Sequence, residues 1–364
     1  MTKFSIFALA LLFSGAACID DKPCGANSDR LWLDIIFIVD NSYLSNTSFI
    51  YDKIESFFTS DIQIGTAYDD PRSTRVSIIV SGLTAVVETE LNTLQSRNEL
   101  TDELNRLRSI PPAQTSAANL EVPLNITMEM LRNTRGFRDN YKKLVVIFTG
   151  SFSGNPWQYT NQLITSGVSI STVNLYGPAL HPTMQQISSP GLAFGASDRN
   201  LTEEMRFAML QTNCHCPYGT TQYTVSTSSA PRKYAICVSE SFGKQSWHAA
   251  QAWCHRSDQY LTTEFTEDKR QFNMNFMNTN QTENAYFNGL FVQQNGTWAW
   301  DQPTGTNPIP LDPSSGKVSS RSGCIADMKY SDGTVSWTPI SCASMFPAIC
   351  EKIGCDTDNY CEQS

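Results

Sequence analysis

The sequence predicts two domains in series: an open, doubly wound α/β domain, followed by a smaller domain held together by disulfide bridges. The chain has 364 residues, which is more than one typical domain needs for its core. Its first half alternates apolar runs of strand length with helical patterns, as helices on both faces of a parallel sheet require. Its second half places cysteines and tryptophans at the spacings of one disulfide-bonded module.

The strands of the first domain, predicted to span 24–214, are indicated by apolar runs. The run Leu33–Val39 is continuous, so this strand is expected to be buried on both faces of a sheet. Further strands are predicted over 76–80, 143–148 and 168–173, with an edge strand over 86–91, and helices over 48–58, 99–107 and 120–131. The order of these elements is that of a doubly wound α/β sheet.

Polar residues follow the first strand, at the place where such a sheet binds its ligands. The rule points to Asp40 and Ser42, and to the loop after Phe148. The Asp40-x-Ser42 corner resembles the metal loop of von Willebrand factor type A domains. The resemblance implies a metal-ion-dependent adhesion site, in which an Asp-x-Ser-x-Ser loop, a Thr and a later Asp hold magnesium through oxygen ligands.

The adhesion motif is incomplete in this chain. Leu44 stands where the family has its second Ser, and Ser45 lies one residue out of register. The strand that should end in Thr-Asp-Gly reads Phe148-Thr-Gly, without the aspartate. The degenerate metal candidates are therefore Asp40, Ser42 and Thr115, with one carboxylate among them. The alternative is that the polar groups after the strand only cap the first helix.

The second domain, predicted to span 215–352, carries an ordered series of anchors. Trp247, Ala250 and Cys254 have the spacing W-x-x-A-x-x-x-C, which lets an amphipathic helix bury one face. The series continues with Tyr286–Leu290, Trp298–Trp300, Cys324, Trp337, Cys342 and Pro347–Glu351. These anchors resemble those of a C-type lectin domain, which implies an α+β fold.

Eleven cysteines occur, and cleavage after Cys18 would leave an even ten. The lectin resemblance implies the pairs Cys216–Cys237, Cys254–Cys350 and Cys324–Cys342. Cys24 and Cys214 bracket the first domain, and Cys355 lies near Cys361 in a short tail, 353–364, so two further bridges are expected there. The alternative is a zinc site that combines Cys214-His215-Cys216 with the two tail cysteines.

The calcium ligands of sugar-binding C-type lectins are a Glu-Pro-Asn or Gln-Pro-Asp triplet and an Asn-Asp pair after a Trp. Here the first position reads Asp312-Pro-Ser and the second Trp337-Thr-Pro, so Asp312 is a degenerate calcium candidate. Asp301 and Asp327 are expected to be solvated surface residues. The irregular loop 301–323 is the expected ligand-binding surface, its contact residues unknown, whereas the Trp298–Trp300 pair is expected to pack in the core.

Residues 1–18 are typical of a secretory signal peptide, with Lys3 before an apolar run over 4–13 and small residues over 14–17. This run is too short to span a membrane and no other apolar run is long enough, so we expect a secreted, extracellular protein without a transmembrane segment. Five N-x-S/T sequons predict glycosylation, at Asn46, Asn125, Asn200, Asn280 and Asn295.

Charge and motifs exclude other classes of function. The 26 basic and 35 acidic residues give a net charge of −9 without a basic cluster, so nucleic acid is not an expected partner. The four histidines belong to no catalytic motif, and His248 and His255 are expected to form a solvent-facing stripe on the lectin helix. We expect neither catalysis nor a cofactor.

The order of signal peptide, type A domain and lectin-like domain resembles the secreted C-type lectins of nematodes. The resemblance implies recognition of carbohydrate, or of a microbial or host surface ligand, in innate defence, and the absent ligands predict that binding does not depend on calcium. The alternative is an extracellular adhesive or structural protein that contacts other proteins through its first domain.

Overall fold

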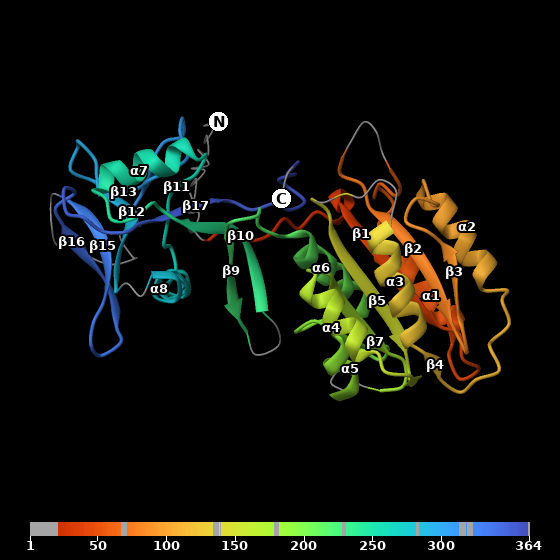
Figure 1. The fold of residues 1–364 in the computed structure, drawn as a ribbon. Helices are drawn as coiled ribbons and strands as arrows, with labels where there is room; N and C mark the ends of the chain where they lie inside the picture. Colours follow the sequence, from red (N-terminus) through yellow and green to blue (C-terminus); the bar gives the residue numbers. More distant parts are fainter. Residues whose placement is uncertain are drawn as a thin grey trace, which may run out of the picture.

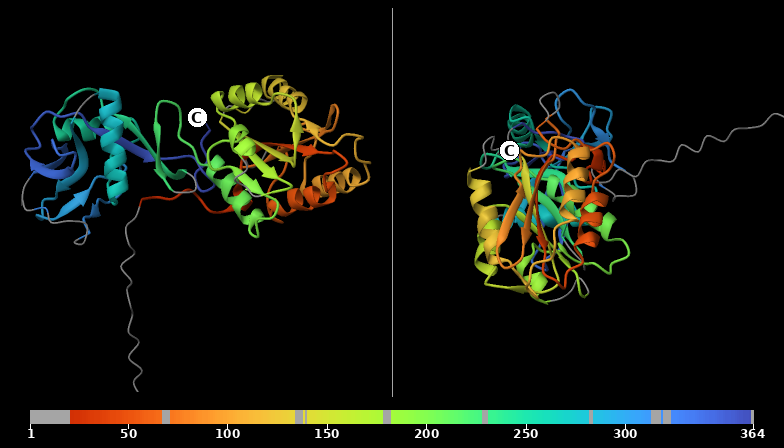
Figure 2. Two further views of the ribbon diagram at one scale, coloured as in Figure 1. Left: turned by 90° about the horizontal axis from the view of Figure 1, so that it is seen from below. Right: turned by 90° about the vertical axis from the view of Figure 1, so that its right-hand side faces the viewer.

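The computed structural model describes residues 21–66, 71–133, 138, 140–177, 182–227, 231–281, 284–312, 318 and 323–362. The chain forms two lobes on either side of a joint, where the C-terminal segment lies (Figure 1). Figure 2 shows the same elongated arrangement from below. The predicted signal peptide lies outside the described residues. In the part of the chain that is described, no helix is long and apolar enough to cross a membrane.

The first lobe is built on a six-stranded sheet with the order β3-β2-β1-β5-β7-β8. Its strands are β1 (Leu33–Asp40), β2 (Arg75–Ser81), β3 (Ala85–Thr89), β5 (Lys142–Thr149), β7 (Ser169–Asn174) and β8 (Ala193–Gly195). All neighbours run parallel except β2 and β3, so β3 is an antiparallel edge strand. The central strand β1 is buried along its whole length, and the predicted doubly wound class is confirmed.

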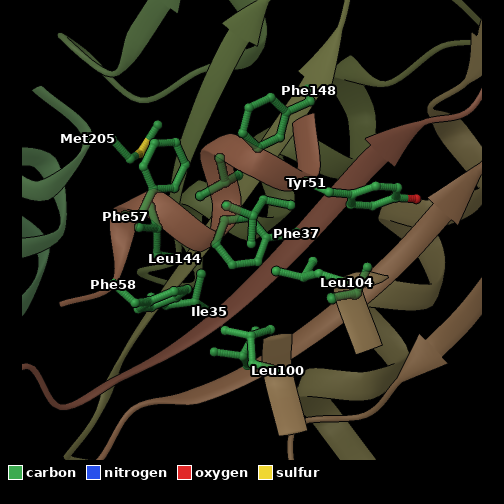
Figure 3. Close-up of a cluster of buried hydrophobic side chains, with 14 of the residues drawn as sticks. Ile35, Phe37, Tyr51, Phe57, Phe58, Leu100, Leu104, Leu144, Phe148 and Met205 are labelled. Atoms are coloured by element: carbon green, nitrogen blue, oxygen red, sulfur yellow. The ribbon is translucent and has the colours of Figure 1, made fainter. Parts of the chain in front are cut away.

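Helices cover both faces of this sheet. One face carries α1 (Thr47–Phe57), α2 (Arg97–Leu107) and α6 (Leu201–Asn213), and the other carries α3 (Glu121–Asn133), α4 (Trp157–Thr165) and α5 (Pro182–Ile187). Successive side chains of β1 point to opposite faces, so Phe37 packs in the first cluster and Ile36 and Ile38 in the second. Figure 3 shows Phe37 surrounded by Tyr51, Phe57 and neighbouring apolar side chains.

Several elements of this lobe differ from the prediction, since the sequence patterns predict no element after residue 173. The structure adds α4, α5, β8 and α6, together with the short strands β4 (Ala118–Asn119) and β6 (Phe152–Ser153) and a 3-10 turn over Ser28–Arg30. α6 buries Leu201, Met205, Ala208 and Met209. This spacing has the helical period and was a usable signal.

In its described residues, the second lobe contains two sheets and two helices. One sheet has the order β11-β17-β10-β9, and the other has the order β14-β13-β12-β15-β16. The elements are β9 (Thr221–Ser226), β10 (Pro231–Glu240), α7 (Trp247–Arg256), β11 (Tyr260–Leu261), α8 (Glu267–Gln281), β12 (Ala285–Val292), β13 (Trp298–Trp300), β14 (Ile309–Pro310), β15 (Cys324–Lys329), β16 (Val335–Ile340) and β17 (Ile349–Ile353). As predicted, α7 buries Trp247, Ala250 and Cys254.

Five disulfide bridges occur among the described residues. They join Cys24 to Cys214, Cys216 to Cys237, Cys254 to Cys350, Cys324 to Cys342, and Cys355 to Cys361. These are the five pairs named from the sequence. The zinc alternative is wrong, because the thiols it needs are consumed in the first, second and fifth bridges.

The joint between the lobes is centred on Trp32, which is fully buried. Its indole Nε1 donates a hydrogen bond to the carbonyl of Asp356 (2.9 Å), and its ring contacts Tyr360 and His215 with centroids 5.0 and 5.2 Å apart. The amide of Asn140 donates to the Cys361 carbonyl (2.7 Å). The tail of the chain therefore binds the first lobe after completing the second.

The position of the joint fixes the direction in which the first sheet points. β1 begins at Leu33, directly after Trp32, and β5 begins at Lys142, two residues after Asn140. Because the central strands are parallel, their carboxyl ends lie at the far side of this lobe. In the second lobe, β15 and β16 lie at the end away from the joint (Figure 1). The two expected binding regions therefore lie at opposite ends of an elongated molecule.

Candidate functional site

The carboxyl end of the first sheet is centred on Asp40, the last residue of β1, which is fully buried. One carboxylate oxygen of Asp40 accepts a hydrogen bond from the backbone N–H of Ser42 (2.8 Å), and the other accepts from the hydroxyl of Thr149 (2.9 Å). Neither Asp40 nor Ser42 caps α1. The N-cap residue of this helix is Asn46, whose side-chain oxygen accepts a hydrogen bond from the N–H of Phe49. The helix-cap alternative is therefore wrong.

The loop after Asp40 gathers hydroxyl groups. The hydroxyls of Ser42 and Ser45 lie 3.1 Å apart. Ser45 is one residue out of register with the family motif, but the turn of the loop brings its hydroxyl next to that of Ser42. Thr115 lies beside this loop through its backbone, because its carbonyl accepts from the N–H of Tyr43 (3.0 Å). Its own hydroxyl donates to the carbonyl of Ala117 (2.9 Å). The structure thus brings together Asp40, Ser42, Ser45 and Thr149, but it turns the hydroxyl of Thr115 to its own loop.

These residues do not fit a magnesium ion. Both oxygens of the single carboxylate already accept hydrogen bonds, and the family's second carboxylate is replaced by Gly150. A Cβ atom on Gly150 would lie 2.1 Å from the ring of Tyr176, so this aromatic ring occupies the space of the missing side chain. Magnesium requires near-octahedral oxygen ligands and charge compensation, which this set does not supply.

Apolar side chains are exposed around this edge instead. Tyr43 and Leu44 from the loop after β1 are 55% and 53% exposed. Leu83, after β2, is 67% exposed, and Tyr176, after β7, is 51% exposed. Since the carboxyl ends of parallel strands meet at one edge of the sheet, these four residues form an apolar rim around Asp40.

The lectin calcium positions of the second lobe lie on or near β16. Trp337, Thr338 and Pro339 pair with Asp327, Ala326 and Ile325 of β15. The hydroxyl of Thr338 lies 3.2 Å from the hydroxyl of Tyr330, so it bonds within the hairpin. Asp312 follows β14, and the Pro and Ser of its triplet lie outside the described residues. No group of three or more His, Cys, Asp or Glu side chains suited to a metal occurs in the described chain.

Asp301 has a structural role, which corrects the expectation of a solvated surface residue. It is 3% exposed and accepts hydrogen bonds from the side chain of Gln251 (2.7 Å) and the N–H of Leu261 (2.9 Å). His255 lies 3.0 Å from the same carboxylate. The solvent-facing stripe expected on the lectin helix is therefore wrong for His255. Asp301 instead ties α7 to β11 and to the start of the long loop.

Asp327 is also fully buried, which corrects the same expectation for this residue. The amide of Asn288 donates to Asp327 (2.6 Å) and to Glu264 (3.3 Å), so the two carboxyl groups share one donor. Trp337 Nε1 donates to Glu264 (3.0 Å). The guanidinium of Arg270 lies 3.8 Å from Glu264 and 3.7 Å from Asp327. Burial, together with the charge of Glu264, raises the pKa of Asp327 well above its usual range.

The tryptophans of the second lobe belong mostly to its core. Trp300 is buried and packs edge-on against Trp337, with ring centroids 5.5 Å apart. Trp298 packs against the same cluster from a half-buried position. Core packing was the expected role of both residues in the Trp298–Trp300 strand. Neither ring forms an open stacking platform for a sugar.

The sequons occupy different surroundings. Asn46 and Asn200 lie at the N-caps of α1 and α6, and Asn295 lies in the turn between β12 and β13, all three exposed. Asn125 is half-buried on α3, and the side chain of Asn280 lies outside the described residues. Exposure at three sites is compatible with the glycosylation that the sequence predicts.

Comparison with protein families identifies both lobes. The model of the von Willebrand factor type A domain matches residues 34–208, and the model of the lectin C-type domain matches residues 243–352. The C-type lectin domain-containing protein 160 of Caenorhabditis elegans is 25% identical over 375 residues. The match covers 95% of this chain and 57% of that relative, so this chain spans little more than half of its length.

Solved structures resemble one lobe each. Proximal thread matrix protein 1 from the mussel byssus is 16% identical, with a TM-score of 0.42 over 52% of this chain and 47% of that one. The Ca²⁺-independent C-type lectin SPL-2 from Saxidomus purpuratus is 20% identical, with a TM-score of 0.30 over 38% of this chain and 93% of that one.

Proposed function

This chain carries a von Willebrand factor type A domain followed by a C-type lectin domain, and we propose that it is a secreted recognition glycoprotein. Its lectin domain would bind carbohydrate or another microbial or host surface ligand without calcium, in innate defence. The long loop that starts at Asp301 would make the contact. No catalytic activity and no cofactor form part of the proposal.

The pairing of β15 with β16 is the observation that carries this proposal. At the two positions where calcium-dependent relatives place an Asn-Asp pair, the chain has Thr338 and Pro339 within a paired strand. A hydroxyl bonded to Tyr330 and a proline ring supply no strong ligand for a hard cation. The fold around them is nevertheless complete, with three disulfides and a buried aromatic cluster in this lobe.

Exposed polar groups of the long loop could make such contacts. The described part of the loop exposes Thr304, Thr306 and Asn307, whose hydroxyl and amide groups both donate and accept hydrogen bonds. Sugar hydroxyls have the same dual character. Because Asp301 is held by α7 and β11, the start of this loop is fixed before any ligand arrives.

A binding screen tests the proposal. The full-length protein is exposed to arrayed glycans and whole microbial cells, with and without a chelator of divalent cations. We expect binding that survives chelation and falls at least about tenfold in Asn307→Arg, while Asn98→Arg on the first lobe leaves it unchanged. Binding that chelation abolishes would contradict the proposal.

A second candidate function is supported by the apolar rim around Asp40. Exposed apolar groups at the ligand-binding edge of a doubly wound sheet are typical of a protein contact, and this contact would need no metal. On this hypothesis the chain is an adhesive protein whose first domain binds other proteins. Leu44→Asp should then abolish binding to cells while Asn307→Arg leaves it intact, the reverse of the pattern expected above.

A further inference from the structure

A groove of about 970 Å³ lies along α6 of the first lobe, and its lining also includes Pro231, the first residue of β10 in the second lobe. One wall is a single face of α6, lined by Glu204, Phe207, Ala208 and Gln211. These positions recur every three or four residues, so they form one stripe along the helix. The other wall is the segment from Ser188 to Phe194, which leads into β8.

The character of this groove is both apolar and acidic. Phe207 is 50% exposed, and Leu192 and Phe194 line the opposite wall. Asp198 and Glu204 contribute carboxylates. Such a surface matches a sugar, whose ring C–H face packs on an aromatic ring and whose hydroxyl and N-acetyl N–H groups donate to carboxylates.

The sequon residue Asn200 lines the end of the same groove. It is the N-cap residue of α6, and unlike Asn46 it makes no side-chain capping hydrogen bond. The side-chain amide of Asn200 therefore makes no capping bond that an attached sugar would have to keep intact. A sugar chain attached there starts at the mouth of the groove and has the helix stripe directly ahead of it.

We propose that the N-linked glycan of Asn200 lies in this groove, with its core N-acetylglucosamine residues packed on Phe207. In the transfer, Nδ2 of Asn200 bonds to the anomeric carbon of the oligosaccharide and loses a proton to solvent. The bond from that carbon to the lipid diphosphate carrier breaks, and the carrier leaves as the diphosphate. The proposal includes passage through the secretory pathway.

The transfer must precede folding of this lobe. The hydroxyl of Thr202, the last residue of the sequon, lies 3.1 Å from the hydroxyl of Ser56 on α1. Leu201, the middle residue of the sequon, is fully buried. A folded chain would not present this tripeptide in an extended form. Docking of the attached sugar into the groove therefore accompanies the packing of α6 on α1.

Access of an enzyme to the core sugars tests the proposal. Full-length protein is produced in animal cells that retain high-mannose glycans, and occupancy of Asn200 is read by glycopeptide mass spectrometry. An endoglycosidase that cuts between the two core N-acetylglucosamine residues is then applied to native and denatured protein. We expect Asn200 to be occupied, and its glycan to be cut at least about tenfold more slowly in the native protein.

Two matched variants connect this protection to the groove. Phe207→Ala should bring the native rate close to the denatured rate, whereas Phe242→Ala, which removes a ring that is 78% exposed on the second lobe, should leave the protection unchanged. Asn200→Gln should lower the Tm by about 2 to 4 °C, and adding Phe207→Ala to it should cost less than Phe207→Ala costs alone.

Three results would overturn the proposal. They are an unoccupied Asn200, equal native and denatured cleavage rates, and protection that Phe207→Ala does not change. Equal rates would mean that the glycan extends into solvent, and protection that Phe207→Ala does not change would mean that a contact outside the Phe207 groove shields the glycan. Because cleavage is measured on the wild-type protein first, the test does not depend on the folding of any variant.

Discussion

The indole ring of Trp32 packs edge-on against the phenol ring of Tyr360, with centroids 5.0 Å apart, and so joins the start of the first strand to the tail of the chain. The tail reaches this position because Cys355, two residues after the end of β17, forms an isolated antiparallel bridge with His215. Trp32 and Tyr141 of the first domain pack with Cys355, Tyr360 and Cys361 of the tail in one small cluster, and His215 contacts the Trp32 ring. The joint is therefore a packed core, and we expect the two lobes to keep a fixed orientation.

Trp32→Ala should loosen this joint. Removal of a fully buried indole leaves a cavity and should cost about 3 to 5 kcal/mol, with an increase in the radius of gyration measured by small-angle X-ray scattering. Tyr218→Ala serves as the control, because Tyr218 lies near the junction but is 96% exposed. An unchanged scattering profile in Trp32→Ala would show that the joint does not hold the lobes.

The joint should also weaken in acid through His215. Burial lowers the pKa of His215 to about 4, assisted by the charge of Lys142, whereas an unfolded histidine has a pKa of 6.5. As the pH falls from about 6.5 to 4, the unfolded chain takes up a proton that the folded chain does not, so the free energy of unfolding falls. Below a pH of about 4 the folded chain is also protonated at His215, so the loss of stability caused by this histidine is complete.

Chemical unfolding at a series of pH values measures this effect. His215→Gln should be less stable than the wild type at neutral pH, yet should lose less stability between pH 6.5 and 4. His248→Gln, on the exposed face of α7, is the matched control and should follow the wild-type profile. If the stability of His215→Gln and of the wild type changed in parallel with pH, the acid sensitivity would not arise from His215.

Asp327 should change the stability with pH in the opposite direction from His215. Because burial and the neighbouring Glu264 raise the pKa of Asp327, the folded lectin domain holds a proton that the unfolded chain releases. The free energy of unfolding should therefore fall as the pH rises from the unfolded value near 3.8 through the raised folded value. The hydrogen bond from Asn288 and the positive charge of the nearby Arg270 limit this loss.

Asp327→Asn tests the proton that the folded protein holds on Asp327. An amide has nearly the same shape and no charge, so the variant should show a flatter pH profile and equal or greater stability at neutral pH. Asp332→Asn, in the exposed turn between β15 and β16, should keep the wild-type profile above a pH of about 4, because hydrogen bonds from Thr334 lower the pKa of Asp332 and confine its effect to more acidic solution. A loss of about 3 kcal/mol or more in Asp327→Asn at neutral pH would mean that the carboxylate is ionised and paired with Arg270.

The space beside Gly150 explains the missing metal site and can be tested by restoring it. Gly150→Asp combined with Tyr176→Ala supplies the second carboxylate and removes the ring that occupies its place. We expect this double variant to bind Mn²⁺ with a Kd on the order of 10⁻³ M by calorimetry, and Tyr176→Ala alone to give no signal. Equal calorimetric signals from the double variant and from Tyr176→Ala alone would mean that Mn²⁺ binds at another place on the protein.

Much of the fold was determined by local patterns. The apolar run Leu33–Val39 predicted the central strand, because a strand buried on both faces needs no polar alternation. The helix that buries Trp247 and Cys254 followed from their spacing. Three disulfide pairs came from the resemblance to C-type lectins and not from the cysteine positions alone, which are compatible with many connectivities.

The sequence by itself thus determined the two domains, their order and the losses at the usual metal positions. Only the tertiary structure decided that Ser45 reaches Ser42, that Asp327 meets Glu264 in the core, and that the tail binds Trp32. The physical reason is that periodicity and spacing report on neighbours along the chain. Burial and the pairing of charges depend on which distant segments the sheets and disulfides bring together.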